Sequence, residues 1–199
     1  MQSVAELILS HARSLPEGAL ISAKELLYLG TRQAVDKALS RLEKRRELMR
    51  LGWGLYVLPV KTRFGTRAPA PEKVVEQLAA TRAETIVPHG AAAANTLGLT
   101  TQVPTKLVYL TSGRSREFKL GAQIIELKQA PQWMLLPTNP AAGQVVRALD
   151  WLGQKHAVRA LIALKQTLPE NTLQELVALR PALPGWMSKS ISQNLVAHG

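Results

Sequence analysis

The chain has 199 residues, in which 25 lysines and arginines outnumber 14 aspartates and glutamates and give a formal net charge of +11. This length suits one large domain or two small ones, and so basic a chain is expected to meet a polyanion, either nucleic acid or an acidic protein. The alternative is a charge that serves only solubility. Because cysteine is absent, disulfides and cysteine-ligated metal sites are excluded, which fits a reducing compartment such as the cytoplasm.

The motifs that the sequence lacks favour a cytoplasmic protein that is not an enzyme. Glu6 and His11 interrupt the apolar N-terminal run, so residues 1–15 are not expected to be a signal peptide. No stretch has the length and apolarity of a membrane-spanning helix. The four histidines are scattered, and the spacings of metal-binding, phosphate-binding and nucleophile motifs are absent. We therefore expect no metal, no cofactor and no catalytic residue.

The N-terminal third begins with a pattern of short elements. Residues 3–14 are expected to form a helix with one apolar face, and residues 19–21 a short strand. A second helix is expected to begin at Ser22, which has the spacing of a capping box with Glu25. Gly30 stands where a helix end accepts a left-handed residue.

A third helix follows at once, with Thr31 as its cap. Val35, Ala38, Leu39 and Leu42 recur at positions i, i+3, i+4 and i+7, so this helix is expected to bury one stripe. The expected core of the N-terminal domain comprises Leu7, Ile8, Leu20, Leu26, Leu27, Val35, Leu39, Leu42, Leu55 and Val57.

Two short strands, residues 48–51 and 55–58, are expected to form a hairpin around the glycines of residues 52–54. Two helices, a tight turn and a hairpin are typical of a winged helix-turn-helix, which places its second helix in the DNA major groove. Arg50 is expected near the wing tip, on phosphate or in the minor groove. Trp53 either stacks on a sugar or packs on the domain. Tyr56 alternates with apolar neighbours and is expected to face outward.

The third helix carries side chains that suit base edges and phosphates. Arginine and lysine bind guanine, and glutamine pairs with adenine. Asp36 is discordant beside phosphate, unless it accepts from a cytosine amine or a neighbouring arginine. The predicted DNA-binding residues are Thr31, Arg32, Gln33, Lys37, Ser40, Arg41, Lys44, Arg50 and Trp53.

A linker is expected at residues 59–71, between a DNA-binding domain at residues 1–62 and a second domain at residues 71–199. This basic, proline-rich segment is either a solvated connector or an arm near the phosphate backbone. The second domain is expected to begin as mixed α/β and end in helices, so the fold class is α+β. Its expected elements are helices at residues 71–82, 90–97, 143–152, 157–168, 172–179 and 186–196, and strands at 85–87, 106–111, 116–120 and 123–128, with Asn139 and Asn171 as caps.

A family resemblance covers most of residues 1–130. It rests on the order and spacing of Gly54–Val57, Gly90–Ala94, Leu97–Leu99, Gln102–Pro104, Tyr109–Thr111 and Ile124–Leu127. In these features the chain resembles the AbiEi-type antitoxins of type IV toxin–antitoxin systems. The resemblance implies an autorepressor that binds double-stranded DNA at repeats in its own promoter. It also implies an antitoxin that counters a nucleotidyltransferase-like toxin, without requiring a stable complex.

The surface that would counter such a toxin is expected among basic residues of the second half, Arg114, Arg116, Arg147, Lys155 and Arg159. Two other classes of function stay open. One is a transcriptional regulator whose C-terminal domain binds a ligand or dimerises, without antitoxin activity. The other is an RNA-binding accessory protein, because basic charge does not distinguish RNA from DNA.

Overall fold

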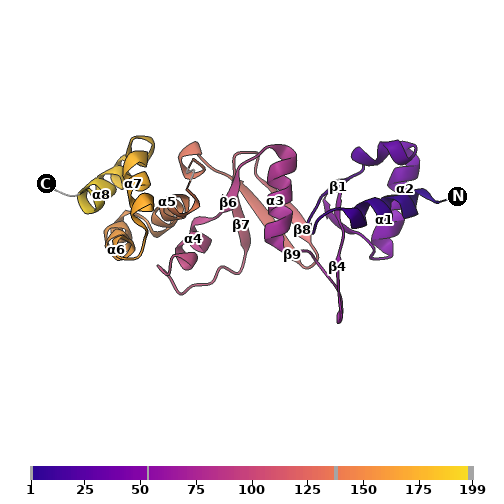
Figure 1. Ribbon diagram of the computed structural model, residues 1–199, viewed down its shortest axis with the longest axis horizontal. Helices are drawn as coiled ribbons and strands as arrows, with labels where there is room; N and C mark the ends of the chain where they lie inside the picture. Colours follow the sequence, from indigo (N-terminus) through magenta and orange to yellow (C-terminus); the bar gives the residue numbers. More distant parts are fainter. Residues whose placement is uncertain (1, 53, 137–138, 197–199) are drawn as a thin grey trace. The chain divides into compact units, whose positions relative to one another are not determined.

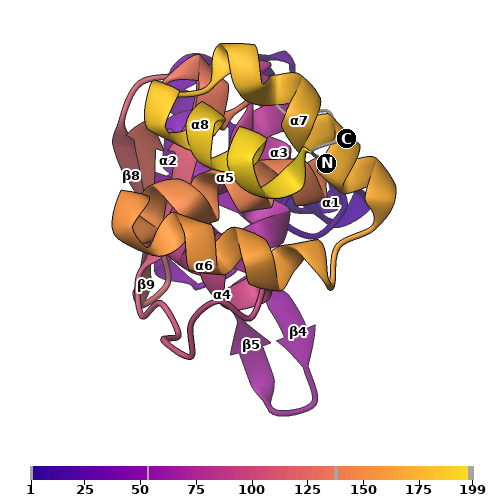
Figure 2. The same ribbon diagram turned by 90° about the vertical axis from the view of Figure 1, so that its left-hand side faces the viewer.

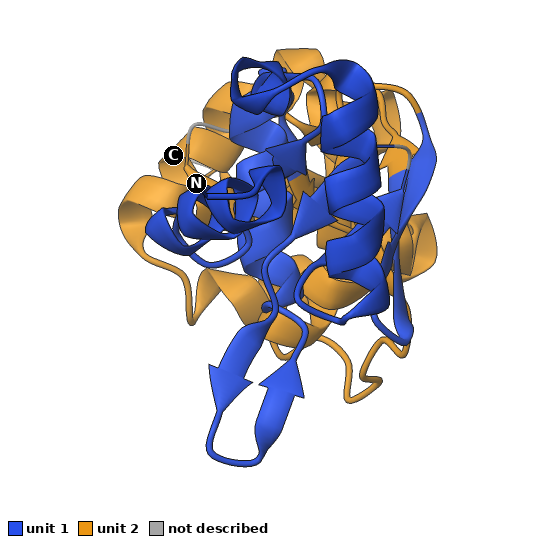
Figure 3. Ribbon diagram, turned by 90° about the vertical axis from the view of Figure 1, so that its right-hand side faces the viewer, with its two compact units in different colours: residues 1–86, 115–127 blue, residues 87–114, 128–199 orange. Residues whose placement is uncertain are grey.

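A computed structural model describes residues 2–52, 54–136 and 139–196 as a mixed α and β fold (Figure 1). The chain divides into two compact units (Figure 3). Unit 1 contains residues 1–86 and 115–127, and unit 2 contains residues 87–114 and 128–199. The expected boundary at residues 62–71 therefore lies within unit 1, because α3 (Pro71–Arg82) and one later strand pair group with the N-terminal elements.

Unit 1 begins with α1 (Val4–Ser14), which a capping box starts. The amide of Ser3 donates to Oε2 of Glu6 at 2.7 Å, and the amide of Glu6 donates to Oγ of Ser3 at 3.3 Å. The capping box expected at Ser22 is wrong. After β1 (Ile21–Ser22), the Ser22 hydroxyl accepts from the Lys24 amide, and the 3₁₀ helix η1 (Glu25–Leu29) has no side-chain cap.

The expected helix that follows is confirmed as α2 (Arg32–Lys44). The Thr31 hydroxyl accepts from the Ala34 amide at 3.3 Å and caps it. Gly30 has φ 166°, which is extended backbone, so the expected left-handed turn is wrong. The buried stripe of α2 is confirmed and packs with residues of α1, β1, η1, the segment after α2 and β3, namely Ile8, Ala12, Ile21, Leu26, Leu48 and Tyr56. Leu27, expected in this core, is 42% exposed.

The hairpin after α2 consists of β2 (Met49–Gly52) and β3 (Leu55–Val57). Together with β1 it forms a three-stranded antiparallel sheet in the order β1-β3-β2. The expectation that Tyr56 faces outward is wrong, because β3 is the central strand and Tyr56 packs into the core at 7% exposure. Burial raises the pKa of the Tyr56 phenol. Trp53 lies outside the described residues.

The segment expected as a linker contains a second hairpin, β4 (Val60–Thr62) and β5 (Gly65–Arg67). It extends away from the helices of unit 1 (Figures 2 and 3). The Thr62 hydroxyl accepts from the Phe64 amide at 3.2 Å and donates to the Gly65 carbonyl at 2.9 Å. Gly65 has φ 121°, which glycine adopts without strain.

Unit 1 is completed by α3 and by two strands that pair antiparallel around a turn at Gly121. These strands are β8 (Arg116–Leu120) and β9 (Gln123–Gln129), whose last two residues belong to unit 2. The expected helix and hairpin are confirmed here. Arg116 forms an ion pair of 2.6 Å with Glu84, and both side chains are largely buried. This ion pair joins the segment after α3 to the start of β8.

Unit 2 has a helical core that closely follows the expected elements. The strand β6 (Ile86–Pro88) leads into it, and its first residue, Ile86, still belongs to unit 1. The other elements of unit 2 are α4 (Gly90–Thr96), β7 (Leu107–Thr111), η2 (Gln132–Met134), α5 (Pro140–Leu152), α6 (Gln154–Lys165), α7 (Glu170–Leu179), η3 (Arg180–Ala182) and α8 (Gly185–Leu195). Asn139 caps α5 by accepting from the Ala141 amide at 2.9 Å, as expected. Asn171 is not a cap, because α7 already begins at Glu170. In the described part of the chain, no helix is long and apolar enough to cross a membrane.

Candidate nucleic-acid interface

The outer face of α2 gathers all the polar residues that the sequence predicted for this helix. The helix presents them side by side, because residues three and four apart share a face. A shallow groove on this face is lined by Arg32, Gln33, Asp36, Lys37, Ser40, Arg41 and Lys44. Since all seven lining residues belong to α2, the groove is a continuous polar strip along the helix.

The charge on this strip is mainly positive. Arg32 donates through Nε to Oδ2 of Asp36 at 2.9 Å, which confirms that Asp36 accepts from a neighbouring arginine. Both side chains are more than half exposed, so this pair contributes little to stability and is screened by salt. Among the described residues, Lys37, Arg41 and Lys44 form no ion pair with a carboxylate. From Lys37 to Lys44 the strip therefore presents three cations that no carboxylate of the described residues compensates.

The two other predicted contacts flanking the strip have different structural roles. Thr31 is exposed, but its hydroxyl already accepts the capping hydrogen bond from Ala34. Arg50 on β2 is exposed, and its Nε donates to the Gly52 carbonyl at 3.3 Å. This bond joins the Arg50 side chain to the backbone of its own strand.

Two further cations, Arg45 and Arg46, follow α2 directly and were not among the predicted DNA-binding residues. Arg46 has φ 59°, a left-handed conformation that a non-glycine residue adopts at a cost of about 1–2 kcal/mol. Its amide donates to the Glu43 carbonyl, and the Glu47 amide donates to the Leu42 carbonyl, both at 2.9 Å. This pattern ends a helix and normally carries glycine at the left-handed position. In the sequence, these two cations could have been found from the run of three basic residues at positions 44–46.

Arg46→Gly is expected to raise the free energy of unfolding by about 0.5–1 kcal/mol, since glycine relieves the strain but makes the unfolded chain more flexible. Ala83→Gly is the matched control, because Ala83 at the end of α3 has φ 51°. Denaturant titration measures both gains. A gain for Ala83→Gly without one for Arg46→Gly would contradict strain at Arg46.

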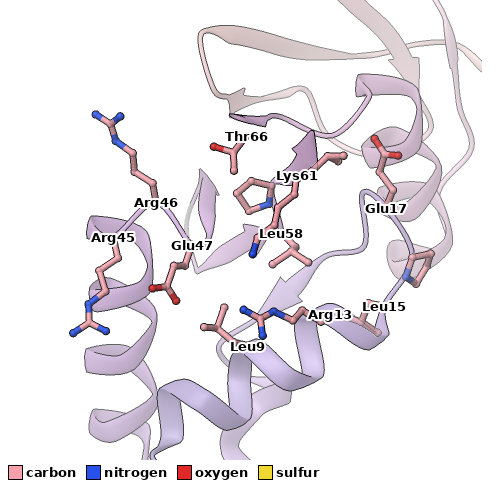
Figure 4. Close-up of a pocket in the computed structure, with 13 residues that line it drawn as sticks. Leu9, Arg13, Leu15, Glu17, Arg45, Arg46, Glu47, Leu58, Lys61 and Thr66 are labelled. Carbon is pink, nitrogen blue, oxygen red and sulfur yellow. The ribbon is translucent and has the colours of Figure 1, made fainter. Parts of the chain in front are cut away.

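A cleft of about 920 Å³ lies beside the end of α2 (Figure 4). Its apolar lining includes Leu9, Leu15 and Leu58. Arg13 and Lys61 point into the cleft, whereas Arg45 and Arg46 point away from it (Figure 4). The cationic and apolar groups of the cleft together suit an anion with an apolar part.

Glu17 at the edge of the cleft is engaged elsewhere. Its Oε1 accepts from the Ala70 amide at 3.0 Å and from Nη1 of Arg67 at 3.1 Å. The hydrogen bond from Ala70, aided by Arg67, lowers the pKa of this carboxyl. Glu17 therefore stays charged and ties the base of the β4–β5 hairpin to the turn after α1.

The basic residues predicted to counter a toxin do not share one environment. Arg114 is exposed at the loop before β8, and Lys155 and Arg159 are exposed on α6. Arg116 is drawn into its ion pair with Glu84. Arg147 is only 4% exposed, so its expected place on a surface is wrong.

Arg147 is buried because α5 is covered on almost every side. Its Nη1 donates to the Met134 carbonyl at 3.1 Å, and its Nε has no partner among the described residues. Burial lowers the pKa of Arg147 to about 10, since a low-dielectric surrounding disfavours the charged form. Also within the described part of the chain, no group of three or more histidines or carboxylates is placed to hold a metal ion.

The chain belongs to DUF6088, a family of unknown function, whose profile matches residues 7–175. The matched segment begins in α1 and ends in α7, so it includes α2, both N-terminal hairpins and most of unit 2. Comparison with curated proteins gives no match.

Proposed function

We propose that this protein binds double-stranded DNA as a winged helix-turn-helix, with α2 in the major groove. The observation that carries the proposal is the polar strip on α2, where Lys37, Arg41 and Lys44 lack a carboxylate partner in the described structure. A major groove about 12 Å wide admits an α-helix. The order of α1, β1, η1, α2 and the β2–β3 hairpin supports this class of DNA-binding domain.

The residues of the strip divide by the chemistry of their contacts. Gln33 and Lys37, in the first half of α2, have the side chains that pair with adenine and guanine edges. Arg41 and Lys44, in its last turn, and Arg50 on β2 suit phosphates, which fix the register of the protein on the duplex. Specificity would therefore come from the start of α2, and most of the affinity from its end.

The biological role rests on the resemblance to AbiEi-type antitoxins and stays a prediction. In this role the protein binds its own promoter and represses it, and it counters a nucleotidyltransferase-like toxin as the antitoxin. A regulator without antitoxin activity needs the same DNA-binding unit. DNA binding is therefore to be tested before repression of the promoter and before antitoxin activity.

The test is binding of the whole chain to DNA from upstream of its own gene and to a scrambled duplex, across a salt series. We expect a preference for the upstream DNA of roughly a thousandfold. The logarithm of affinity should fall linearly with the logarithm of salt concentration, by about 0.9 for each phosphate contacted. Equal affinity for both duplexes would contradict sequence recognition by α2, and no binding at low salt would contradict the whole proposal.

A further inference from the structure

The β4–β5 hairpin exposes an aromatic side chain and basic side chains that do not help it to fold. Every residue from Lys61 to Arg67 is exposed, and Phe64 at the tip is 87% exposed. The Arg63 guanidinium lies over the Phe64 ring, 4.6 Å from its centroid. No acidic residue occurs between Glu47 and Glu72. The tip therefore presents one large aromatic ring among cations.

A single exposed aromatic residue indicates little by itself, because folded surfaces carry many. The hairpin, however, is ordered at both of its ends. Thr62 bridges the turn through two hydrogen bonds, and the Arg67–Glu17 ion pair with the Ala70 bond to Glu17 fixes the base. A flexible connector would need none of these contacts. Fixing both ends reduces the entropy lost when the tip binds a partner.

We propose that the β4–β5 hairpin inserts its tip into the minor groove of duplex DNA, where Phe64 wedges between two base pairs and bends the helix. Apolar side chains of minor-groove proteins partly unstack a base step in this way, and neighbouring arginines read the groove and its phosphates. Arg63 lies beside the wedge, with its guanidinium 4.6 Å from the centroid of the Phe64 ring. The inference rests on the proposed function for its choice of partner, and adds a second contact site to α2.

An alternative occupant of the tip is another protein, which would cover Phe64 but would not respond to DNA. The charge of the tip distinguishes the two partners, because an exposed tip with Arg63 and no carboxylate of its own is complementary to phosphate. The cation over the ring is also compatible with stacking, since both the ring and the guanidinium are planar. Duplex DNA is therefore the partner that the chemistry of the tip favours.

The experiment uses upstream DNA that carries 2-aminopurine at successive adenines and a fluorophore pair at its two ends. The wild-type chain is expected to raise 2-aminopurine emission at one step and to shorten the end-to-end distance. Phe64→Ser should abolish both signals and lower affinity by about tenfold, with an unchanged melting temperature because Phe64 packs on nothing buried. Arg63→Ala should reduce the salt slope by about 1.

Val103→Ser is the matched control, since Val103 is 75% exposed in a loop of unit 2 and should leave both signals intact. Tight, specific binding with identical signals for the wild type and Phe64→Ser would overturn the wedge and leave the proposed function standing. Failure of the wild type to bind any duplex would overturn both. Loss of the signals in Phe64→Ser alone supports the hairpin as a second DNA site.

Discussion

With α2 in the major groove as proposed, replacing Lys37 and Arg41 together by alanine is expected to lower affinity for the upstream duplex by at least the roughly 1–3 kcal/mol of one base contact, because a phosphate contact is lost as well. The two side chains lie one turn apart on the exposed strip of α2 and share no ion pair with a described carboxylate. Neither belongs to the buried stripe, and alanine favours the helix, so the fold should persist. The loss would therefore report contacts to DNA.

Lys155 and Arg159 on α6 provide a control that is matched in charge, spacing and exposure. Their double alanine variant also removes two cations at positions i and i+4 of an exposed helix face. Fluorescence anisotropy at fixed salt measures both variants on upstream and scrambled DNA. We expect a loss below about threefold for the α6 variant, since these two cations would add only to the general positive charge, which salt screens. Equal losses in both variants would mean that net charge, rather than α2, drives binding.

The single variants separate base contacts from phosphate contacts. Lys37→Ala is expected to weaken binding to the upstream DNA more than to scrambled DNA, whereas Arg41→Ala should weaken both alike and reduce the salt slope by about 1. The same loss on both duplexes for Lys37→Ala would assign it to phosphate. Arg32→Ala should cost less than Lys37→Ala, because Asp36 already compensates the Arg32 charge.

The parts of this site that sequence predicts well are those that local pattern decides. The period of Val35, Ala38, Leu39 and Leu42 specifies both the buried stripe of α2 and the opposite polar strip. The Thr31 cap is equally local, since its hydroxyl reaches an amide three residues away. Both features depend on residues within one or two turns, so they were predictable without knowledge of the rest of the chain.

The errors occur where distant segments decide the outcome. Tyr56 alternates like an outward residue, but β3 is central in its sheet and Tyr56 packs against the helices. Arg147 carries a charge that predicts a surface, but the segments around α5 bury nearly all of its faces. The burial of Tyr56 and of Arg147 cannot be predicted from the spacing of neighbouring residues, because both arise from tertiary packing.

The β4–β5 hairpin was missed for a different reason. It buries almost nothing, so it has no alternation of apolar and polar residues to reveal two strands. Its order comes from the side chain of Thr62, the backbone freedom of Gly65 and the ion pair of Arg67 with Glu17, which is 50 residues away. Only the first two are local, and flanking prolines favoured a linker instead.

Gly90→Ala is expected to destabilise unit 2 by about 3 kcal/mol. Gly90 begins α4 and lies buried against α5. A Cβ there would overlap the carbonyl oxygen of Arg147 and lie 2.7 Å from Cβ of Trp151. Because the first obstacle is backbone, the new methyl group cannot be accommodated by a rotamer change and must separate the two helices. Ala93, Ala94 and Ala148 form the small-residue contact between these helices, which that separation would open.

Gly185→Ala is the matched control for this prediction, because Gly185 also begins a helix, α8, but a Cβ there meets nothing within 4 Å. We expect it to be neutral or to stabilise by up to about 1 kcal/mol, since alanine favours helix over glycine. Denaturant unfolding followed by tryptophan emission suits both variants, because Trp133, Trp151 and Trp186 belong to unit 2. If Gly90→Ala unfolded at the same denaturant concentration as Gly185→Ala, the close approach of α4 to α5 would be contradicted. A loss confined to Gly90→Ala would establish that glycine is required there to bring the two helices together.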